Sequence, residues 1–119
     1  MPVTAVSESI FQTKVGTEHT LTSVVSAGVF VLNTSVQSMI ANDMVTFRVK
    51  SVVMSAQPLG LVYRATYQHS MSYDPIKSSV PITSMYRADF TLECNSSGAA
   101  SSGVGSNGPV IAWRVDNVS

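Results

Sequence analysis

Apolar and polar residues alternate one by one along much of this chain, which is the pattern of a β-strand with one buried face. Phe11, Thr13 and Val15 begin the alternation, and its longest stretch covers 82–94. Valine and other strand-forming residues are frequent in these segments. The pattern predicts β-strands at 11–15, 21–25, 28–32, 45–50, 61–68, 82–94 and 110–118.

Two segments depart from the alternation. Val36, Met39 and Ile40 stand at i, i+3 and i+4, the spacing of one helix face, and they follow a Thr-Ser pair suited to N-capping. We therefore predict one short helix near 35–42. At 51–54 the apolar phase changes, which indicates a bulge or a stretch buried on both faces.

Turn and loop signals separate the strands. A proline-containing turn falls at 56–60, a polar connection fills 69–81, and a Gly/Ser stretch at 95–109 predicts a flexible loop. Short strands at this spacing are typical of a sandwich or barrel. We expect an all-β, antiparallel sandwich in one domain over 1–119, with 1–9 as an extended N-terminal arm.

Composition adds one unusual number. Only 12 % of the residues are charged, against about 25 % in an ordinary soluble domain. Polarity comes instead from 29 Ser and Thr residues, and 18 valines favour strands over helices. Charged residues normally keep protein surfaces from associating with one another, and this chain has few of them. Such a chain is expected to bind something over much of its surface or to aggregate.

The charges and the single cysteine exclude several classes of protein. The net charge is zero and no block of basic residues exists, so the footprint of tight nucleic-acid binding is missing. Cys94 has no partner for an internal disulfide. No apolar run is long enough to span a membrane, and the first residues lack the features of a signal peptide. We expect a soluble protein with no membrane partner, made without export.

No catalytic site is recognisable. His69 and Asp74 lie near several serines, but a triad is defined by three-dimensional geometry that proximity along the chain does not supply. Cys94, with His19 or His69 as its base, falls on the apolar phase of a strand, where a free cysteine is usually a small buried hydrophobe. We predict no catalytic residue, no cofactor and no enzyme activity.

Metal and phosphate sites also lack their usual residues. Two isolated histidines, one cysteine and scattered acids do not form a ligand cluster, so no metal site is predicted. A cation held between subunits by Asp43 or Asp74 stays open. The Gly-rich segment 98–108 has no lysine and no following helix, which excludes a phosphate-binding loop.

Three cations are the one candidate for nucleic-acid contact. Arg48 and Lys50 lie two residues apart on one strand face, and Arg64 falls on the strand that follows. Together they could touch phosphate groups. The alternative is an ordinary solvated or intersubunit face, and the sequence favours this alternative.

Three segments, 34–54, 57–65 and 108–116, carry a resemblance to a known family. The first has the pattern of a short helix running into a strand, and the second that of a Pro/Gly turn followed by a strand. The third looks like a closing strand, with Gly108 before alternating apolar residues. In this order they resemble the jelly-roll coat proteins of small icosahedral RNA viruses, particularly those of plants and their satellites.

The resemblance implies a jelly roll that assembles with copies of itself into a virion after synthesis in the host cytoplasm. Coat proteins of this kind usually carry an Arg/Lys-rich N-terminal arm, and this sequence has none. Contacts with viral RNA are therefore expected to be weak and non-specific. The chain is also short for eight full strands, so its loops must be minimal or one strand pair reduced.

Two functions are weighed ahead of enzyme activity. The first is a structural capsid protein that self-assembles into a small icosahedral shell around a viral genome. The alternative is a non-catalytic β-sandwich binding module, such as a carbohydrate-binding or phage accessory (decoration) protein. In that case Tyr63, Tyr67, Tyr73 and Tyr86 would line a recognition face, although strand packing explains the alternating tyrosines better.

Overall fold

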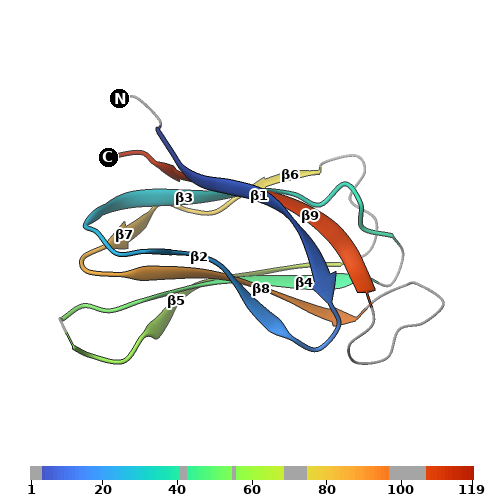
Figure 1. Ribbon diagram of the computed structural model, residues 1–119, viewed down its shortest axis with the longest axis horizontal. Helices are drawn as coiled ribbons and strands as arrows, with labels where there is room; N and C mark the ends of the chain where they lie inside the picture. Colours follow the sequence, from blue (N-terminus) through green and yellow to red (C-terminus); the bar gives the residue numbers. More distant parts are fainter. Residues whose placement is uncertain (1–3, 41–42, 55, 69–74, 97–106) are drawn as a thin grey trace.

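The computed structural model describes residues 4–40, 43–54, 56–68, 75–96 and 107–119. These residues form two β-sheets that lie face to face (Figure 1). The five-stranded sheet contains β1 (Thr4–Lys14), β9 (Asn107–Asn117), β3 (Gly28–Ser35), β6 (Ile76–Ser78) and β7 (Ile82–Ser84). The four-stranded sheet contains β2 (Glu18–Val24), β8 (Ala88–Ser96), β4 (Met44–Ser51) and β5 (Gly60–Gln68). All strand pairs are antiparallel, which confirms the predicted all-β antiparallel sandwich.

The strands pair in a nested order, as if the chain were folded back on itself. The innermost pair is β4 with β5. Outside it, β3 pairs with β6 and β7, β2 pairs with β8, and β1 pairs with β9. The first four strands lie alternately in the five-stranded and the four-stranded sheet. The nested pairs are therefore divided between the two sheets. The resulting orders are β1-β9-β3-β6, with β7 also beside β3, and β2-β8-β4-β5. Both ends of the chain come together at one end of the β1–β9 pair (Figure 1).

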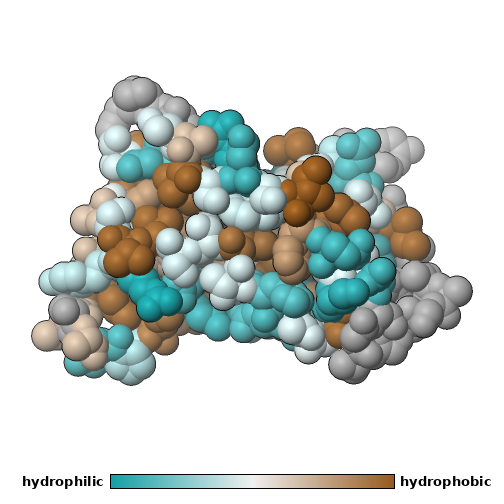
Figure 2. Space-filling model, viewed as in Figure 1, coloured by the Kyte–Doolittle hydropathy of each residue, from teal (hydrophilic) through white to brown (hydrophobic). Residues whose placement is uncertain are grey.

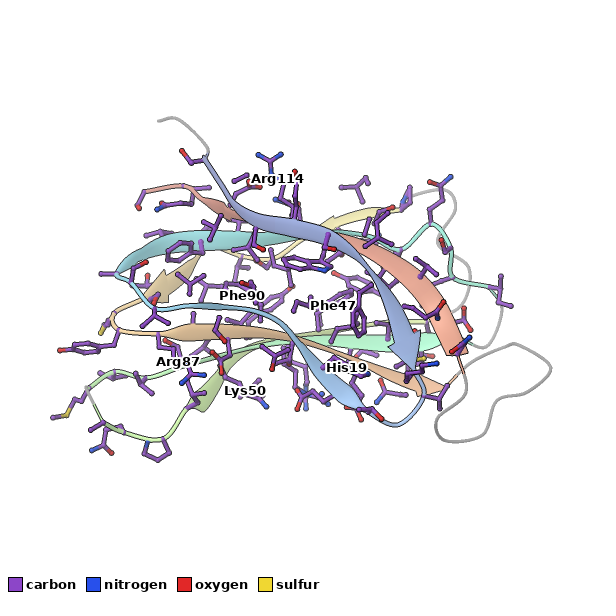
Figure 3. All side chains as sticks on the ribbon, viewed as in Figure 1. His19, Phe47, Lys50, Arg87, Phe90 and Arg114 are labelled. Carbon is purple, nitrogen blue, oxygen red and sulfur yellow. The ribbon has the colours of Figure 1, made fainter. Side chains whose placement is uncertain are left out.

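The core lies between the two sheets. Phe47 of β4 and Phe90 of β8 are buried between them (Figure 3). Phe30, Ile111 and Trp113 of the five-stranded sheet pack into the same cluster. Burying one such side chain contributes roughly 1.5–3 kcal/mol. Since successive side chains point to opposite faces of a strand, the polar residues between these apolar ones lie on the outer faces of the sandwich.

The single strand predicted over 82–94 is wrong. The structure divides this segment into β7 and β8, which belong to different sheets, with a bend at 85–87. The Ser84 hydroxyl holds the start of the bend by donating to the Ser26 carbonyl at 2.8 Å. The alternation continues through the bend because the chain passes from one inner sheet face to the other.

The short helix predicted near 35–42 is not found among the described residues, and 41–42 lie outside them. A turn follows β3 instead, closed by the Met39 amide, which donates to the Val36 carbonyl at 3.1 Å. Both side chains are buried in the core. Their helix-like spacing arises because the turn carries the chain over the core to β4.

The part of the chain that the structure describes also has no helix long and apolar enough to cross a lipid bilayer.

The bulge or doubly buried stretch predicted at 51–54 is also wrong. β4 ends at Ser51, and Val53 and Met54 lie in a bend with exposed side chains. Val53 and Met54 therefore belong to an exposed loop and not to a buried strand.

Two terminal or loop segments fall partly outside the described residues. Of the expected arm 1–9, residues 4–9 belong to β1 and pair with β9. Of the expected Gly/Ser loop 95–109, the first and last residues belong to β8 and β9, and 97–106 lie outside the described residues. Within the polar connection 69–81, β6 forms a short strand that the sequence pattern does not reveal.

Candidate functional site

The outer face of the four-stranded sheet carries two of the three predicted nucleic-acid contacts. Val45, Phe47 and Val49 of β4 are buried in the core. Arg48 and Lys50 therefore point to the opposite, outer face of the sheet. Because β8 lies beside β4 and β2 beside β8, acidic residues of those strands reach the same face.

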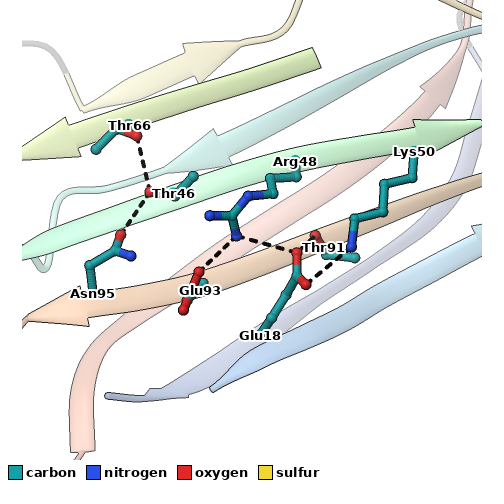
Figure 4. A network of polar contacts seen from close by, with 8 residues as sticks. All are labelled: Glu18, Thr46, Arg48, Lys50, Thr66, Thr91, Glu93 and Asn95. Carbon is teal, nitrogen blue, oxygen red and sulfur yellow. Dashed lines mark hydrogen bonds and ion pairs between the residues drawn. The ribbon is translucent and has the colours of Figure 1, made fainter. Parts of the chain in front are cut away.

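Two carboxylates neutralise these two cations (Figure 4). The Arg48 guanidinium donates to Glu93 of β8 at 2.8 Å and to Glu18 of β2 at 3.3 Å. The Lys50 ammonium lies 3.1 Å from the other oxygen of Glu18. The Thr91 hydroxyl donates to the Glu18 carboxylate at 2.7 Å. We call these five residues the charged network.

The network shifts the protonation of two of its members. The hydrogen bond from Thr91, together with the charges of Lys50 and Arg48, holds the pKa of Glu18 below its ordinary value despite partial burial. The hydrogen bond and charge of Glu93, with the charge of Glu18, raise the pKa of Arg48. Glu18 is therefore ionised and Arg48 protonated at neutral pH.

The energetic role of the network is modest and its net charge is zero. Its charged side chains are between 23 % and 32 % exposed, and partly exposed ion pairs contribute about 1 kcal/mol or less each. The two acids, Glu18 and Glu93, cancel the charges of Arg48 and Lys50. A phosphate group would have to compete with these carboxylates for the charge of either cation.

A chain of hydroxyl and amide groups extends the polar face toward β5 (Figure 4). The Thr46 and Thr66 hydroxyl oxygens lie 3.0 Å apart, and Thr46 also donates to the Asn95 side-chain oxygen at 2.7 Å. These contacts join β5, β4 and β8, so the outer face is held in a fixed arrangement across three strands.

Arg64 differs from the other two predicted contacts. It lies directly opposite Arg48 in the β4–β5 pairing and is exposed. Within the part of the chain that the structure describes, no ion pair joins Arg64 to an acid. Like charges opposite each other repel, and the pull of Glu93 and Glu18 on Arg48 offsets this. The structure thus places the three cations together but leaves only Arg64 unneutralised among the described residues.

The residues weighed for catalysis do not form a site in the described chain. Cys94 is fully buried, and His19 packs on Phe11 with ring centroids 4.7 Å apart. His69 and Asp74 lie outside the described residues. The described residues hold no group of three or more His, Cys, Asp or Glu suited to a metal ion. Asp43, considered as a ligand between subunits, is buried and accepts a hydrogen bond from the Ile40 amide at 2.8 Å.

One end of the sandwich is unusual because its connecting segments carry a single charge, that of Arg87 just before β8. Here β2 is followed by β3, β4 by β5, and β7 by β8. The segments 25–28, 52–59 and 79–86 contain no Asp, Glu, Lys, Arg or His. The nearest charge, Arg87, is paired with Asp89 through two hydrogen bonds of 2.9 and 3.1 Å.

Exposed apolar side chains gather at this end. Val53 is 73 % exposed, Met85 51 % and Tyr86 50 %, and they line one open hollow together with Ala27 and Val29. We call these five residues the loop-end patch. Figure 2 shows apolar surface at this end of the molecule, on the left, and also toward the opposite end of the same face. Contiguous exposed apolar surface of this kind usually marks an interaction site.

The sequence identifies the cations but not the acids that neutralise them. Glu93 alternates outward on a predicted strand, yet only the pairing of β4 with β8 brings it beside Arg48. Glu18 lies just before the strand predicted at 21–25, so its place on the sheet is not visible either. The loop-end patch has a sequence signal in its uncharged segments, but their meeting at one end depends on the strand order.

Comparison with known proteins does not assign the chain to a family. No protein-family model matches it, and neither the curated proteins nor the solved structures give a significant match.

Proposed function

We propose that this protein is a structural capsid subunit with a jelly-roll fold, and that copies of it assemble into a small icosahedral shell around a viral genome. The observation that carries the proposal is the uncharged, apolar loop-end patch on a chain of very low charge. The strand order gives independent support.

The nested pairing is the arrangement that a jelly roll requires. A jelly roll contains eight antiparallel strands in two sheets. Here β7 pairs with the first residues of β3 and β6 with its last residues, so these two short strands occupy one strand position. With the seven remaining strands they fill eight positions, four in each sheet. Sharing one strand position between β6 and β7 is consistent with a jelly roll in so short a chain.

The loop-end patch favours association with copies of the chain. Burying charged groups is costly unless they are paired. The loop-end patch itself contains no charged side chain, and the neighbouring Arg87 is paired with Asp89. Methionine and aromatic side chains are frequent in protein interfaces, where they adapt to the opposing surface. In a closed symmetric assembly, modest contacts of this kind repeat many times and terminate in a finite shell.

The charged face supports only weak contact with RNA. The carboxylates of Glu18 and Glu93 occupy Arg48 and Lys50, so Arg64 is the cation of this face that remains for a phosphate group. One such cation per subunit gives little affinity by itself. Many copies on one shell surface would multiply it, since linked contacts act together.

The alternative, a carbohydrate-binding or phage accessory module, has less support. Such a module needs exposed aromatic side chains on one recognition face. Tyr63 and Tyr67 are half-buried and pack against the core, and Tyr67 meets Phe47 edge to face with centroids 5.9 Å apart. Tyr86 is exposed but lies at the loop-end patch, away from them.

Negative-stain electron microscopy of the purified protein tests the proposal directly. We expect closed particles of uniform diameter. Fields that contain only single small domains, at protein concentrations and salt conditions that favour association, would contradict it and favour the binding module.

A further inference from the structure

A second apolar patch lies on the outer face of the five-stranded sheet. Ile10 of β1 lies opposite Ala112 of β9, which lies opposite Ser35 of β3, which in turn lies opposite Ile76 of β6. These four residues form one row across four strands, and we call them the sheet patch. Ile10 is 70 % exposed and Ile76 63 %.

The sheet patch is hollowed in its middle. Ala112 and Ser35 have small side chains, and the two isoleucines stand at the ends of the row. Open hollows lie on both sides of Ala112, one reaching Ile76 and the other reaching Ile10. The patch therefore presents a depression between two isoleucine side chains, and Glu8 and Arg114 border it.

The charges beside the sheet patch are paired with one another. Arg114, on the outer face of the same sheet (Figure 3), donates to Asp116 at 2.5 Å and lies 3.8 Å from Glu8. The Asn33 amide donates to the other oxygen of Asp116 at 2.8 Å. Arg114 thus lies between two carboxylates at the border of the sheet patch. The four residues of the sheet patch carry no charge, as is also true of the loop-end patch.

The two patches lie at opposite ends of β3. Val29, at the start of this strand, belongs to the loop-end patch, and Ser35, at its end, belongs to the sheet patch. At 3.3 Å per residue they are separated by about 20 Å. Two different neighbours can therefore occupy the two patches at the same time.

We infer that the loop-end patch of one copy docks on the sheet patch of the next copy, in a head-to-tail contact. The inference rests on the proposed function, because it names the surfaces that hold the shell together. Val53, Met85 and Tyr86 project from bends and suit the depression over Ala112 and Ser35. Head-to-tail contacts between unlike surfaces generate closed rings when the rotation closes, and rings are the units from which a shell is built.

Crosslinking between two single-cysteine variants tests this contact. Met85→Cys places a thiol in the loop-end patch, and Ile10→Cys places one in the sheet patch. The two variants, carrying different tags, are assembled together and treated with a short bismaleimide crosslinker. Cys94 is buried, so the unmodified protein serves as the background control. Val80→Cys, at a 57 % exposed position outside both patches, replaces Ile10→Cys as the matched control.

We expect crosslinked dimers that contain one chain of each variant, and their loss when Val80→Cys replaces Ile10→Cys. Dimers of Met85→Cys with itself would overturn the inference, because they would show two loop ends in contact. Intact particles without crosslinks between the variants would also overturn it and leave the proposed function standing. If the unmodified protein forms no particles, the proposed function itself fails. A second pair, Tyr86→Cys with Ile76→Cys, gives the same test where a variant of the first pair does not assemble.

Discussion

The guanidinium of Arg48 donates to the carboxylate of Glu93 at 2.8 Å, from β4 to the neighbouring strand β8. Arg48, which the sequence suggests as a nucleic-acid contact, is thus already paired with an acid on the same sheet face. Arg64, which lies opposite Arg48 on β5, forms no ion pair with an acid among the described residues. This relationship separates the three predicted contacts into two that hold the sheet and one that is left for a partner.

Arg64→Gln should therefore weaken binding of a short single-stranded RNA. Each phosphate contact adds about 0.7 to the slope of log K against log salt for single strands, so the slope should fall by about that amount. Fluorescence anisotropy over a salt series measures it. Lys14→Gln, a change on the other sheet, is the matched control and should leave the slope unchanged. Equal slopes for Arg64→Gln and the unmodified protein would remove Arg64 from the RNA contact.

Glu18→Gln should lower the free energy of unfolding at neutral pH. Folding lowers the pKa of Glu18 from its ordinary value of 4.5, so the folded state prefers the ionised form. This contribution is present above that ordinary value and is lost as the pH falls through the lowered pKa. The partly exposed pairs limit it to about 1 kcal/mol.

Urea unfolding followed by the fluorescence of Trp113 measures the effect of Glu18→Gln. The difference between variant and unmodified protein should shrink as the pH is taken well below 4.5. Glu8→Gln changes a more exposed acid, 3.8 Å from its cation, and should have a smaller effect at neutral pH. A difference that stays constant down to low pH would mean that the carboxylate charge is not its cause.

Gly108→Ala should destabilise the fold where β9 begins. A Cβ at this position would meet the Thr13 hydroxyl and come within 2.6 Å of the Cys94 sulfur. Both of those side chains are fully buried, so they have little room to move. Overpacking of this kind costs typically about 1–3 kcal/mol.

The melting temperature measured by circular dichroism tests the Gly108→Ala prediction. Gly60→Ala is the matched control, because a Cβ at Gly60 finds no atom nearer than 3.9 Å. It should leave the melting temperature nearly unchanged. Similar losses for both variants would mean that the close approach at Gly108 is not what requires glycine.

Val53→Asp should prevent assembly without unfolding the subunit. Val53 is 73 % exposed, so the folded chain tolerates a carboxylate there. In an interface the same carboxylate would be buried without a partner, which typically costs several kcal/mol. Analytical ultracentrifugation should show a shift from particles to single subunits, with an unchanged circular dichroism spectrum. Val62→Asp, at a 54 % exposed position on β5, should still assemble, and particles of Val53→Asp equal to those of Val62→Asp would exclude the loop-end patch from the contact.

The sequence predicts the strands better than it predicts where they end. Alternation identifies the inner faces of β4 and β8 because burial forces apolar residues to every second position. It fails at 82–94, where a bend between the sheets keeps the same phase, and at β6, which has only three residues. The residue spacing also predicts a helix wrongly at Val36 and Met39. These two core residues lie in a turn, and their spacing happens to match that of one helix face.

The candidate surfaces depend even more on long-range pairing. The cations Arg48, Lys50 and Arg64 are visible in the strand pattern, but their partner Glu18 becomes a neighbour only when β2 pairs with β8 and β8 with β4. The row of the sheet patch joins residues from four strands that are far apart in the sequence. Local patterns carry no information about such neighbours, so strand order has to be known first.

The mass of the purified protein in solution tests the central claim, self-assembly into a closed shell, most directly. Light scattering after size exclusion should be recorded with absorbance at 260 and 280 nm on the same peak. The account predicts one uniform peak in the megadalton range, with excess absorbance at 260 nm if nucleic acid is enclosed. A monomer or dimer across salt and pH would contradict it.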